Sequence, residues 1–249
     1  MFGNQILQVV RKIPRTKHIV ITRYALSFDG QSINPDWLSD RRNIFAKITI
    51  PSINLQTNKN FTWLILIDDS ILETESKFLH KLISSEINVL FKPGNSPFSH
   101  DPNYWKKMFP VIPPGFRILT TRLDSDDWVH PKFIEKIQNA AQRLKRDSAI
   151  FFPIGLNIDI LKHELKILFF RNNQFASLLE HPTHYPFQTV HKLDHTELSR
   201  HGNYRMVYQN LFMWGTVLHT RNLLNKSRGV KIPNFMARFF RAAAFPVSE

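Results

Sequence analysis

The chain has 249 residues, a hydrophobic fraction of 43%, no cysteine and a formal net charge of +13. This length and composition suit one globular domain with an ordinary core, and the lack of cysteine excludes disulfides, thiolate metal sites and cysteine nucleophiles. No stretch approaches the roughly 18 apolar residues of a membrane span, and the N-terminus lacks a signal-peptide pattern, so we expect a cytoplasmic protein, either soluble or peripheral on the inner face of the cell membrane.

The first half of the chain alternates apolar runs with segments of helical periodicity. The apolar runs predict strands at 18–24, 61–67, 87–91 and 116–121. The periodic segments predict helices at 37–50, 71–85 and 131–145, and Pro51 is expected to end the first of them. This order predicts an α/β fold with a mostly parallel sheet flanked by helices.

The second half has weaker helical signals. Strands are predicted at 149–153, 165–170, 205–208 and 215–219, with a turn near 161–163. We therefore expect a mixed or antiparallel C-terminal extension of the same sheet, within a single domain over residues 1–249.

The C-terminal tail has aromatic and aliphatic residues at helical spacing, accompanied by lysine and arginine. This pattern predicts an amphipathic helix over residues 231–245. Such a helix either lies on a membrane surface or packs on the protein's own core.

Three carboxylates, Asp124, Asp126 and Asp127, stand where the strand at 116–121 has ended and a helix is about to begin. Like charges this close repel, and proteins usually offset them with a cation. Aspartate is also a good helix cap. By itself the triplet indicates either a divalent metal site or an acidic cap.

Polar residues also end the other predicted parallel strands, namely Thr22 and Arg23, Asp68 and Asp69, and Thr121 and Arg122. Because the carboxyl ends of parallel strands meet at one edge, where α/β proteins bind ligands, we expect these residues to converge. Two arginines, several carboxylates and a divalent ion suit an anionic phosphate ester.

Several blocks together resemble the family of putative rhamnosyltransferases, which are GT-A-type enzymes of bacterial surface polysaccharide synthesis. The blocks are the Trp37…Arg41 spacing and residues 21–24, 50–57, 61–68, 121–127, 175–179, 189–190 and 214–222. The resemblance spans about residues 18–224. It implies a GT-A fold with a nucleotide-binding half at 18–130 and an acceptor half at 131–224.

The resemblance also implies substrates, a cofactor and residue roles. The donor would be a nucleotide-diphosphate sugar, the acceptor a glycan or a lipid-linked glycan, and the cofactor Mn²⁺ or Mg²⁺. The implied metal residues are Asp124, which would face the metal or the ribose, Asp126, Asp127 and His219. The implied donor-binding residues are Thr22, Arg23, Asp68, Asp69 and Arg122, and Arg122, beside the phosphates or the sugar, is also an implied catalytic residue.

An inverting transferase needs a general base for the acceptor hydroxyl. In GT-A enzymes this base is usually a carboxylate that follows the Asp-x-Asp motif, which Asp124-Ser-Asp126 matches here, so the resemblance implies Asp194 or Glu197, with His195 as a third option, and we favour Asp194. The alternative for Asp194 is a helix N-cap with Glu197 as its capping-box partner.

Two other functions compete with a transferase. The net charge of +13 suits a basic nucleic-acid-binding module without catalysis, although no zinc-finger, helix-turn-helix or aromatic RNA-binding motif is present. The second is a zinc site among five histidines, which lack the two-histidine helix spacing with an intervening glutamate. These are His181, His184, His191, His195 and His201.

Overall fold

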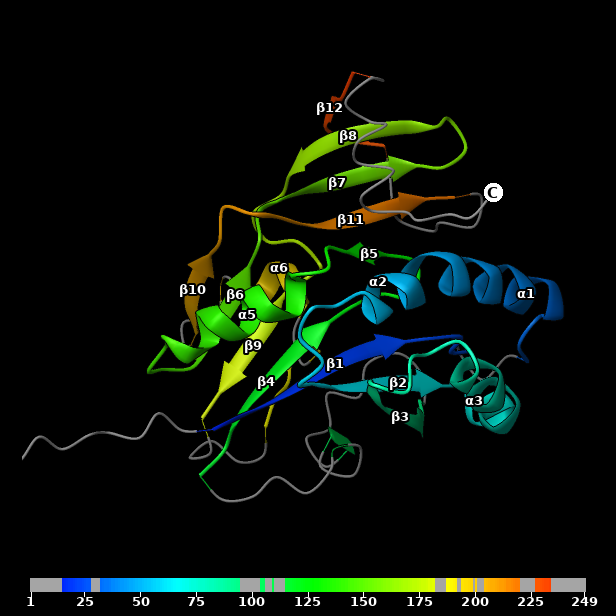
Figure 1. Ribbon diagram of the computed structural model, residues 1–249, viewed down its shortest axis with the longest axis horizontal. Coiled ribbons are helices and arrows are strands. Elements are labelled where there is room, and N and C mark those ends of the chain that lie inside the picture. Colours follow the sequence, from blue (N-terminus) through cyan, green and yellow to red (C-terminus); the bar gives the residue numbers. More distant parts are fainter. Residues whose placement is uncertain are drawn as a thin grey trace, which may run out of the picture.

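The computed structural model describes residues 15–27, 32–94, 104–105, 109, 115–181, 187–191, 194–198, 200, 204–219 and 227–233. Within these ranges the chain forms two β-sheets with helices between and beside them (Figure 1). None of the helices in the described ranges has the length and apolar character needed to cross a membrane.

The larger sheet is mostly parallel, which confirms the predicted fold class. Its strands are β1 (Thr16–Arg23), β2 (Thr62–Ile67), β3 (Asn88–Pro93), β4 (Arg117–Arg122), β6 (Ser148–Phe151), β9 (Ser177–Glu180) and β10 (Arg205–Tyr208). They lie in the order β10-β6-β9-β4-β1-β2-β3, and only β9 runs against its neighbours. The C-terminal ends of β1, β2 and β4 therefore meet at one edge.

Helices cover one face of this sheet. They are α1 (Pro35–Ile44), the π-helical turn η1 (Phe45–Thr49), α2 (Ile50–Asn54) and α5 (Phe133–Gln142). Their apolar residues pack on the side chains of Val20, Trp63 and Ile65. The opposite face carries Ile19, Ile21, Leu64 and Leu66, which pack against Trp105. Helix α3 (Leu72–His80), preceded by the 3₁₀ turn η2 (Asp69–Ile71), lies beside the edge strand β3, whereas Leu198 of the short helix α6 (His195–Leu198) packs on Ala149 of β6 and Leu178 of β9.

The prediction that Pro51 ends the first helix was wrong. The chain stays helical to Asn54 because the π-turn η1 precedes the proline, and the Ile50 N–H donates to the carbonyl of Phe45. Pro51 then occupies the first turn of α2, where a missing N–H costs little. The helix predicted over 71–85 ends early, at His80, because the Asn54 side chain holds the turn at Leu82 and Ser84.

The second half extends the larger sheet through β6, β9 and β10, which confirms the predicted mixed extension, and it also forms a second, smaller sheet. Its strands are β5 (Trp128–Val129), β7 (Ile154–Asp159), β8 (Glu164–Phe169), β11 (Phe212–Leu218) and β12 (Val230–Lys231), in the order β12-β8-β7-β11-β5. The sequence analysis missed β7. It also began a helix at residue 231, where Val230 and Lys231 instead pair with β8 and the Ile232 N–H donates to the Leu165 carbonyl. The rest of that predicted helix, from 234, lies outside the described residues.

Candidate functional site

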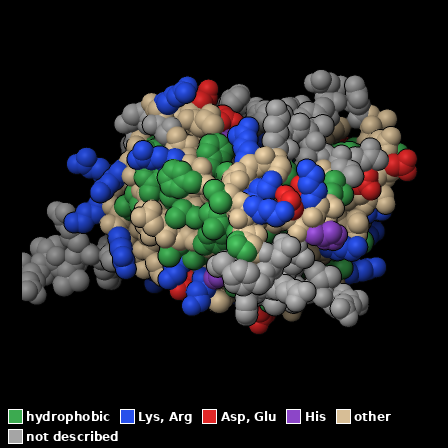
Figure 2. Space-filling model, turned by 90° about the horizontal axis from the view of Figure 1, so that it is seen from above, with side chains coloured by type: hydrophobic (Ala, Val, Ile, Leu, Met, Phe, Trp, Pro, Cys, Tyr) green, Lys and Arg blue, Asp and Glu red, His purple; other side chains and the backbone are tan. Residues whose placement is uncertain are grey.

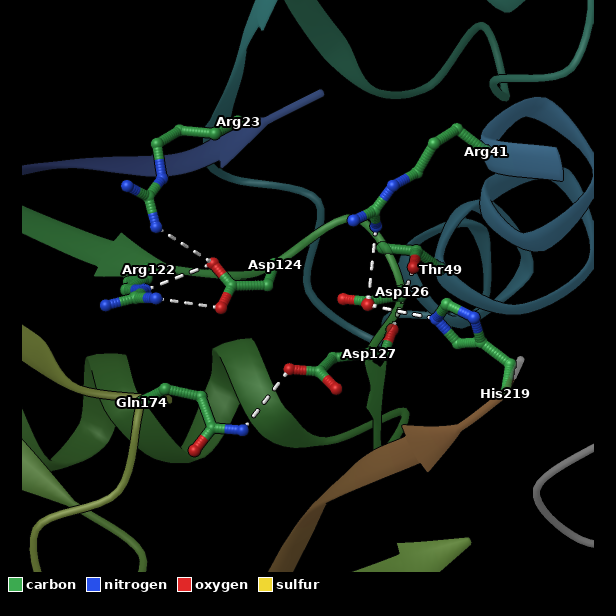
Figure 3. A network of polar contacts seen from close by, with 9 residues as sticks. All are labelled: Arg23, Arg41, Thr49, Arg122, Asp124, Asp126, Asp127, Gln174 and His219. Carbon is green, nitrogen blue, oxygen red and sulfur yellow. Dashed lines mark hydrogen bonds and ion pairs between the residues drawn. The ribbon is translucent and has the colours of Figure 1, made fainter. Parts of the chain in front are cut away.

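The acidic loop, defined here as residues 123–127, links the larger sheet to the smaller one. It follows β4 and leads into β5, so it lies at the edge where the parallel strands end. The carboxylates of Asp124, Asp126 and Asp127 point to different partners (Figure 3). Each therefore has its own electrostatic environment.

Asp124 is held by two arginines from the ends of neighbouring parallel strands. Its Oδ1 and Oδ2 accept from Nε and Nη2 of Arg122, at 3.1 and 2.8 Å, and Arg23 Nη2 lies 3.8 Å from Oδ1. Burial alone would raise the pKa of Asp124, but the two guanidinium groups hold it well below its ordinary value. The predicted convergence of Arg23, Arg122 and Asp124 is therefore observed.

Asp126 faces the other side of the loop, toward α1 and the end of β11. Its Oδ2 lies 3.3 Å from Arg41 Nη1 and 3.2 Å from His219 Nε2 (Figure 3). The structure thus brings together Asp126 and His219, which are far apart in sequence. A carboxylate oxygen and an imidazole nitrogen are both ligands that Mn²⁺ accepts.

Asp127 is buried, at 1% exposure, and its side chain points toward Gln174, in the loop that precedes β9 (Figure 3). Its Oδ2 lies 3.5 Å from Gln174 Nε2, and within the described residues its buried Oδ1 has no hydrogen-bond partner. Burial, followed by the charges of Asp126 and Asp124, raises the pKa of Asp127 well above its ordinary value. A buried carboxylate in this state would gain from a nearby cation.

The acidic loop does not cap the next helix. The residue before α5 is Lys132, which makes no side-chain cap hydrogen bond. The loop is anchored instead by its backbone, because the Thr49 hydroxyl of η1 donates to the Asp127 carbonyl at 2.9 Å. The helix-cap alternative for the acidic triplet was therefore wrong.

Within the described residues, the side chains of three predicted donor-binding residues, Thr22, Asp68 and Asp69, make no hydrogen bond or ion pair with the acidic loop, unlike that of Arg23. The buried Thr22 hydroxyl accepts from Trp63 Nε1 at 2.9 Å, within the core. Asp68 accepts from the backbone N–H groups of Ser27 and Ser70, at 3.2 and 3.0 Å, and so caps η2. Asp69 is exposed. The side chains of Thr22 and Asp68 are thus engaged in internal hydrogen bonds.

Asp194 lies near the arginine pair, and it is also a helix cap. Its Oδ1 accepts from the backbone N–H and hydroxyl of Thr196, at 2.8 and 2.7 Å, at the start of α6. Burial raises the pKa of Asp194, but these two hydrogen bonds outweigh it and lower the pKa overall. The negative charge of Asp194 acts to raise the pKa values of both Arg23 and Arg122, so Asp194 lies near the arginine pair.

Several residues of this site were not assigned a role from the sequence. Arg41 was visible only as part of the Trp37…Arg41 spacing, and nothing in the local sequence singled out Gln174 or Trp105. His191 is buried and its ring stacks on Trp105, with centroids 5.7 Å apart. Burial, and then the charges of Arg23 and Arg122, lower the pKa of His191 well below its ordinary value.

In the part of the chain that is described, no three carboxylate or histidine side chains lie together as a ready metal-binding group. Of the four predicted metal residues, Asp126 and His219 meet, whereas Asp124 and Asp127 face other partners. The histidines considered for zinc are dispersed, since His181 pairs with Asp147 while His195 packs against Phe170. His184 and His201 lie outside the described residues.

Comparison with protein families gives one match. Residues 31–201, more than half of the chain, match the sequence model of the family described as "Putative rhamnosyl transferase". No curated protein matches the sequence.

Solved structures give distant similarities. S. aureus TarS residues 1–349, solved in complex with UDP-GlcNAc, is 11% identical with a TM-score of 0.47, and the match covers 83% of this chain and 60% of that one. Mouse xyloside xylosyltransferase 1 is 11% identical with a TM-score of 0.36, covering 55% and 52%. The 4-diphosphocytidyl-2C-methyl-D-erythritol synthase from Anaerococcus prevotii is 15% identical with a TM-score of 0.40, covering 78% and 87%.

Proposed function

Because the chain belongs to the family of putative rhamnosyl transferases, which are glycosyltransferases, we propose that it moves a sugar from a nucleotide-diphosphate donor to a glycan or lipid-linked acceptor. The observation that carries the proposal is the meeting of Arg23 and Arg122 beside the acidic loop, at the carboxyl edge of parallel strands. Two guanidinium groups at such an edge suit the phosphates of a donor.

The donor would approach the side of the loop where Asp124 lies. Asp124 pre-orients both guanidinium groups through its ion pairs, so that the two groups can meet phosphate oxygens without a large loss of side-chain entropy. In this role Asp124 positions arginines rather than holding a metal. Asp69, exposed after β2, remains available for the nucleoside.

The residues fit a divalent ion on the other side of the loop. Asp126 and His219 would hold Mn²⁺ or Mg²⁺, and the buried Asp127 Oδ1, which lacks a hydrogen-bond partner among the described residues, would turn toward it. When bound, the ion would stabilise negative charge on the leaving diphosphate. Arg41 supplies the positive charge beside Asp126.

The transfer step is proposed to invert the sugar. The acceptor hydroxyl oxygen forms a bond to the anomeric carbon, the bond from that carbon to the diphosphate breaks, and the hydroxyl proton passes to a carboxylate. Asp194 is our candidate for that carboxylate because its charge acts on both Arg23 and Arg122 and it therefore lies near the arginine pair. Its lowered pKa makes it a weak base in the free protein, so we expect donor binding to loosen its contact with Thr196.

The reaction is proposed to take place at the inner face of the cell membrane. Surface polysaccharide synthesis supplies glycan and lipid-linked acceptors at the inner face of the cell membrane, and the net charge of +13 would draw the protein to an anionic surface. A nucleic-acid-binding role has only that net charge in its favour. The carboxylates of the acidic loop would repel a phosphate backbone.

Donor binding provides the test. We expect calorimetry with a panel of nucleoside diphosphates and Mn²⁺ to reveal at least one ligand, and Arg122→Gln to weaken it about 10- to 100-fold because a buried bidentate cation is lost. The matched control is Arg15→Gln, which removes an exposed arginine directly before β1, at the opposite, amino edge of the same sheet. Folded wild-type protein that binds no nucleoside diphosphate would contradict the proposal.

Binding of Mn²⁺ tests the proposed metal residues independently of donor binding. Asp126→Asn should weaken Mn²⁺ binding, measured by calorimetry or electron paramagnetic resonance, without unfolding the protein. The control Glu86→Gln changes an exposed carboxylate far from the loop in sequence. Equal Mn²⁺ affinity in Asp126→Asn and wild type would remove Asp126 from the metal site and leave the donor proposal standing.

A further inference from the structure

A second cationic site lies at the opposite edge of the larger sheet. A hollow of about 400 Å³ is lined by Arg143, Leu144, Lys145, Arg146, Ser148 and Arg205. Ser148 and Arg205 begin β6 and β10, which run parallel to β4. The hollow is therefore at the amino edge of these strands, whereas the acidic loop is at the carboxyl edge. About five residues of strand, roughly 16 Å, separate the two edges along β4.

The lining of the hollow carries positive charge and no negative charge. Four of its six lining residues are cationic, none is acidic, and among the described residues none of the four takes part in an ion pair. The nearest acid in sequence, Asp147, is engaged by His181, whose Nδ1 lies 2.7 Å from Asp147 Oδ1. Figure 2 shows lysine and arginine side chains gathered at the end of the molecule where α5 and β10 lie.

A buried arginine supports the hollow from behind. Arg117, at 1% exposure, donates from Nη1 to the carbonyl of Leu144 at 2.7 Å and from Nε to Thr16 Oγ1 at 3.2 Å. Its buried Nη2 has no partner among the described residues. Arg117 does not itself line the hollow, so an anion seated there would stabilise this buried positive charge through space rather than by a hydrogen bond.

Stabilisation of a helix explains only part of this cluster. Arg143 is the C-cap residue of α5, where a cation interacts favourably with the last carbonyl groups. Lys145, Arg146 and Arg205 lie beyond the helix, and Arg205 comes from a different element. Their convergence requires another reason.

We propose that this hollow binds a phosphate group, either the headgroup of an anionic phospholipid or a soluble phosphate compound. Three of its four cations are arginines, whose planar guanidinium groups bind phosphate oxygens in pairs. A hollow of about 400 Å³ accommodates a small anionic group rather than an extended nucleic-acid backbone. The site does not depend on the proposed transferase activity.

The test uses the full chain at constant ionic strength. Binding is measured to phosphatidylglycerol vesicles, to neutral phosphatidylcholine vesicles and to inorganic pyrophosphate. We expect the double variant R146Q/R205Q to bind about 30-fold more weakly than wild type to whichever phosphate probe wild type binds. The matched control K81Q/K132Q removes the same net charge from exposed positions outside the hollow and should weaken binding less than about threefold.

The vesicle and pyrophosphate arms separate the two sources of phosphate. Loss of vesicle binding in R146Q/R205Q, with no pyrophosphate binding by wild type, assigns the hollow to a lipid headgroup, and loss of pyrophosphate binding assigns it to a soluble phosphate. Equal losses in the two double variants would overturn the site in favour of diffuse attraction by net charge. A wild-type protein that binds neither phosphatidylglycerol vesicles nor pyrophosphate would also overturn the site. Unchanged nucleoside-diphosphate binding by R146Q/R205Q keeps this result separate from the transferase proposal.

Discussion

Neighbouring carboxylates of the acidic loop differ because the loop crosses the edge of the larger sheet. Side chains alternate between the faces of a strand, so Arg23 continues the face of Ile19 and Ile21, away from α1. Asp124 joins Arg23 on that face, whereas Asp126 meets Arg41 of α1 on the other. One short loop therefore presents an arginine-bound carboxylate to one side and a histidine-paired carboxylate to the other, so the arginines and the proposed ion would approach the donor's diphosphate from two directions.

At the scale of single residues, His18 gives a prediction about acid stability. His18 is buried at 2% exposure between Thr121 Oγ1, at 2.8 Å, and Gln138 Nε2, at 3.2 Å, and burial lowers its pKa from 6.5 to about 3. Below pH 6.5 His18 is protonated in the unfolded chain but stays neutral in the folded protein. The unfolded state therefore gains stability relative to the folded state as the pH falls. By pH 5 this single group should cost about 2 kcal/mol.

The measurement is the free energy of unfolding, from urea denaturation between pH 7 and pH 5. His18→Gln should reduce the slope of stability against pH by about one proton, whatever it does to the stability at pH 7. His80→Gln, at an exposed histidine, should keep the wild-type slope. A slope unchanged in His18→Gln would mean that His18 is protonated in the folded protein.

The residues that could be predicted from sequence were those whose position follows from strand ends. Arg23, Arg122 and Asp124 converge because parallel pairing of β1 and β4 fixes where consecutive strands stop. Arg41 and Gln174 approach the loop from other elements, and no local pattern encodes such a contact. Thr22 was misjudged, because a strand-end hydroxyl can equally serve a buried indole such as that of Trp63.

At the scale of elements, a buried polar clamp fixes α1, which carries Arg41, to the larger sheet. Glu75 of α3 is fully buried, accepts from the Tyr24 hydroxyl at 2.9 Å and is paired with Arg42 of α1 through Nε at 3.1 and 3.0 Å. The Arg42 side chain is 37% exposed. Removing Arg42 would therefore leave the buried Glu75 carboxylate without its cation, whereas removing Glu75 would leave Arg42 able to contact water.

Arg42→Ala should cost about 3 kcal/mol of unfolding free energy, because it leaves a buried carboxylate with only Tyr24 as a partner. The double variant Arg42→Ala/Glu75→Leu should recover much of that loss, since no buried charge remains. Chemical denaturation of the single and double variants measures both effects. The exposed Lys77–Glu73 pair is the control, and Lys77→Ala should cost less than about 0.5 kcal/mol. A similarly small cost for Arg42→Ala would show that water solvates Glu75 readily.

The elements that sequence patterns missed were those decided by tertiary contacts. Strand β2 was predictable because all six of its residues are buried and apolar or β-branched. The continuation of the helix through Pro51 was not, because it depends on the π-turn at 45–49. Strand β7 was missed because glycine and asparagine, at Gly155 and Asn157, interrupt its apolar pattern. The Trp214 ring lies where a side chain at 155 would be, which explains the glycine.

At the scale of the whole molecule, excess positive charge and local ion pairs act in opposite directions. The net charge of +13 means that exposed lysine and arginine repel one another across the surface. The ion pairs around the acidic loop involve side chains with 3–26% exposure, so dissolved salt reaches them less easily. The two proposed anion sites, at opposite edges of one sheet, are places where bound phosphate groups would offset part of this repulsion.

Salt should therefore stabilise the free protein. Raising sodium chloride from about 0.02 to 0.2 M shortens the Debye length from roughly 20 to 7 Å, and should raise the free energy of unfolding at pH 7 by about 1 kcal/mol. Thermal and urea unfolding without phosphate in the buffer measure the effect. R146Q/R205Q, with two fewer positive charges, should gain less than wild type, because less repulsion remains to be screened. If stability fell with salt instead, the ion pairs would outweigh the self-repulsion. The arginines around the acidic loop would then contribute substantially to the free energy of unfolding.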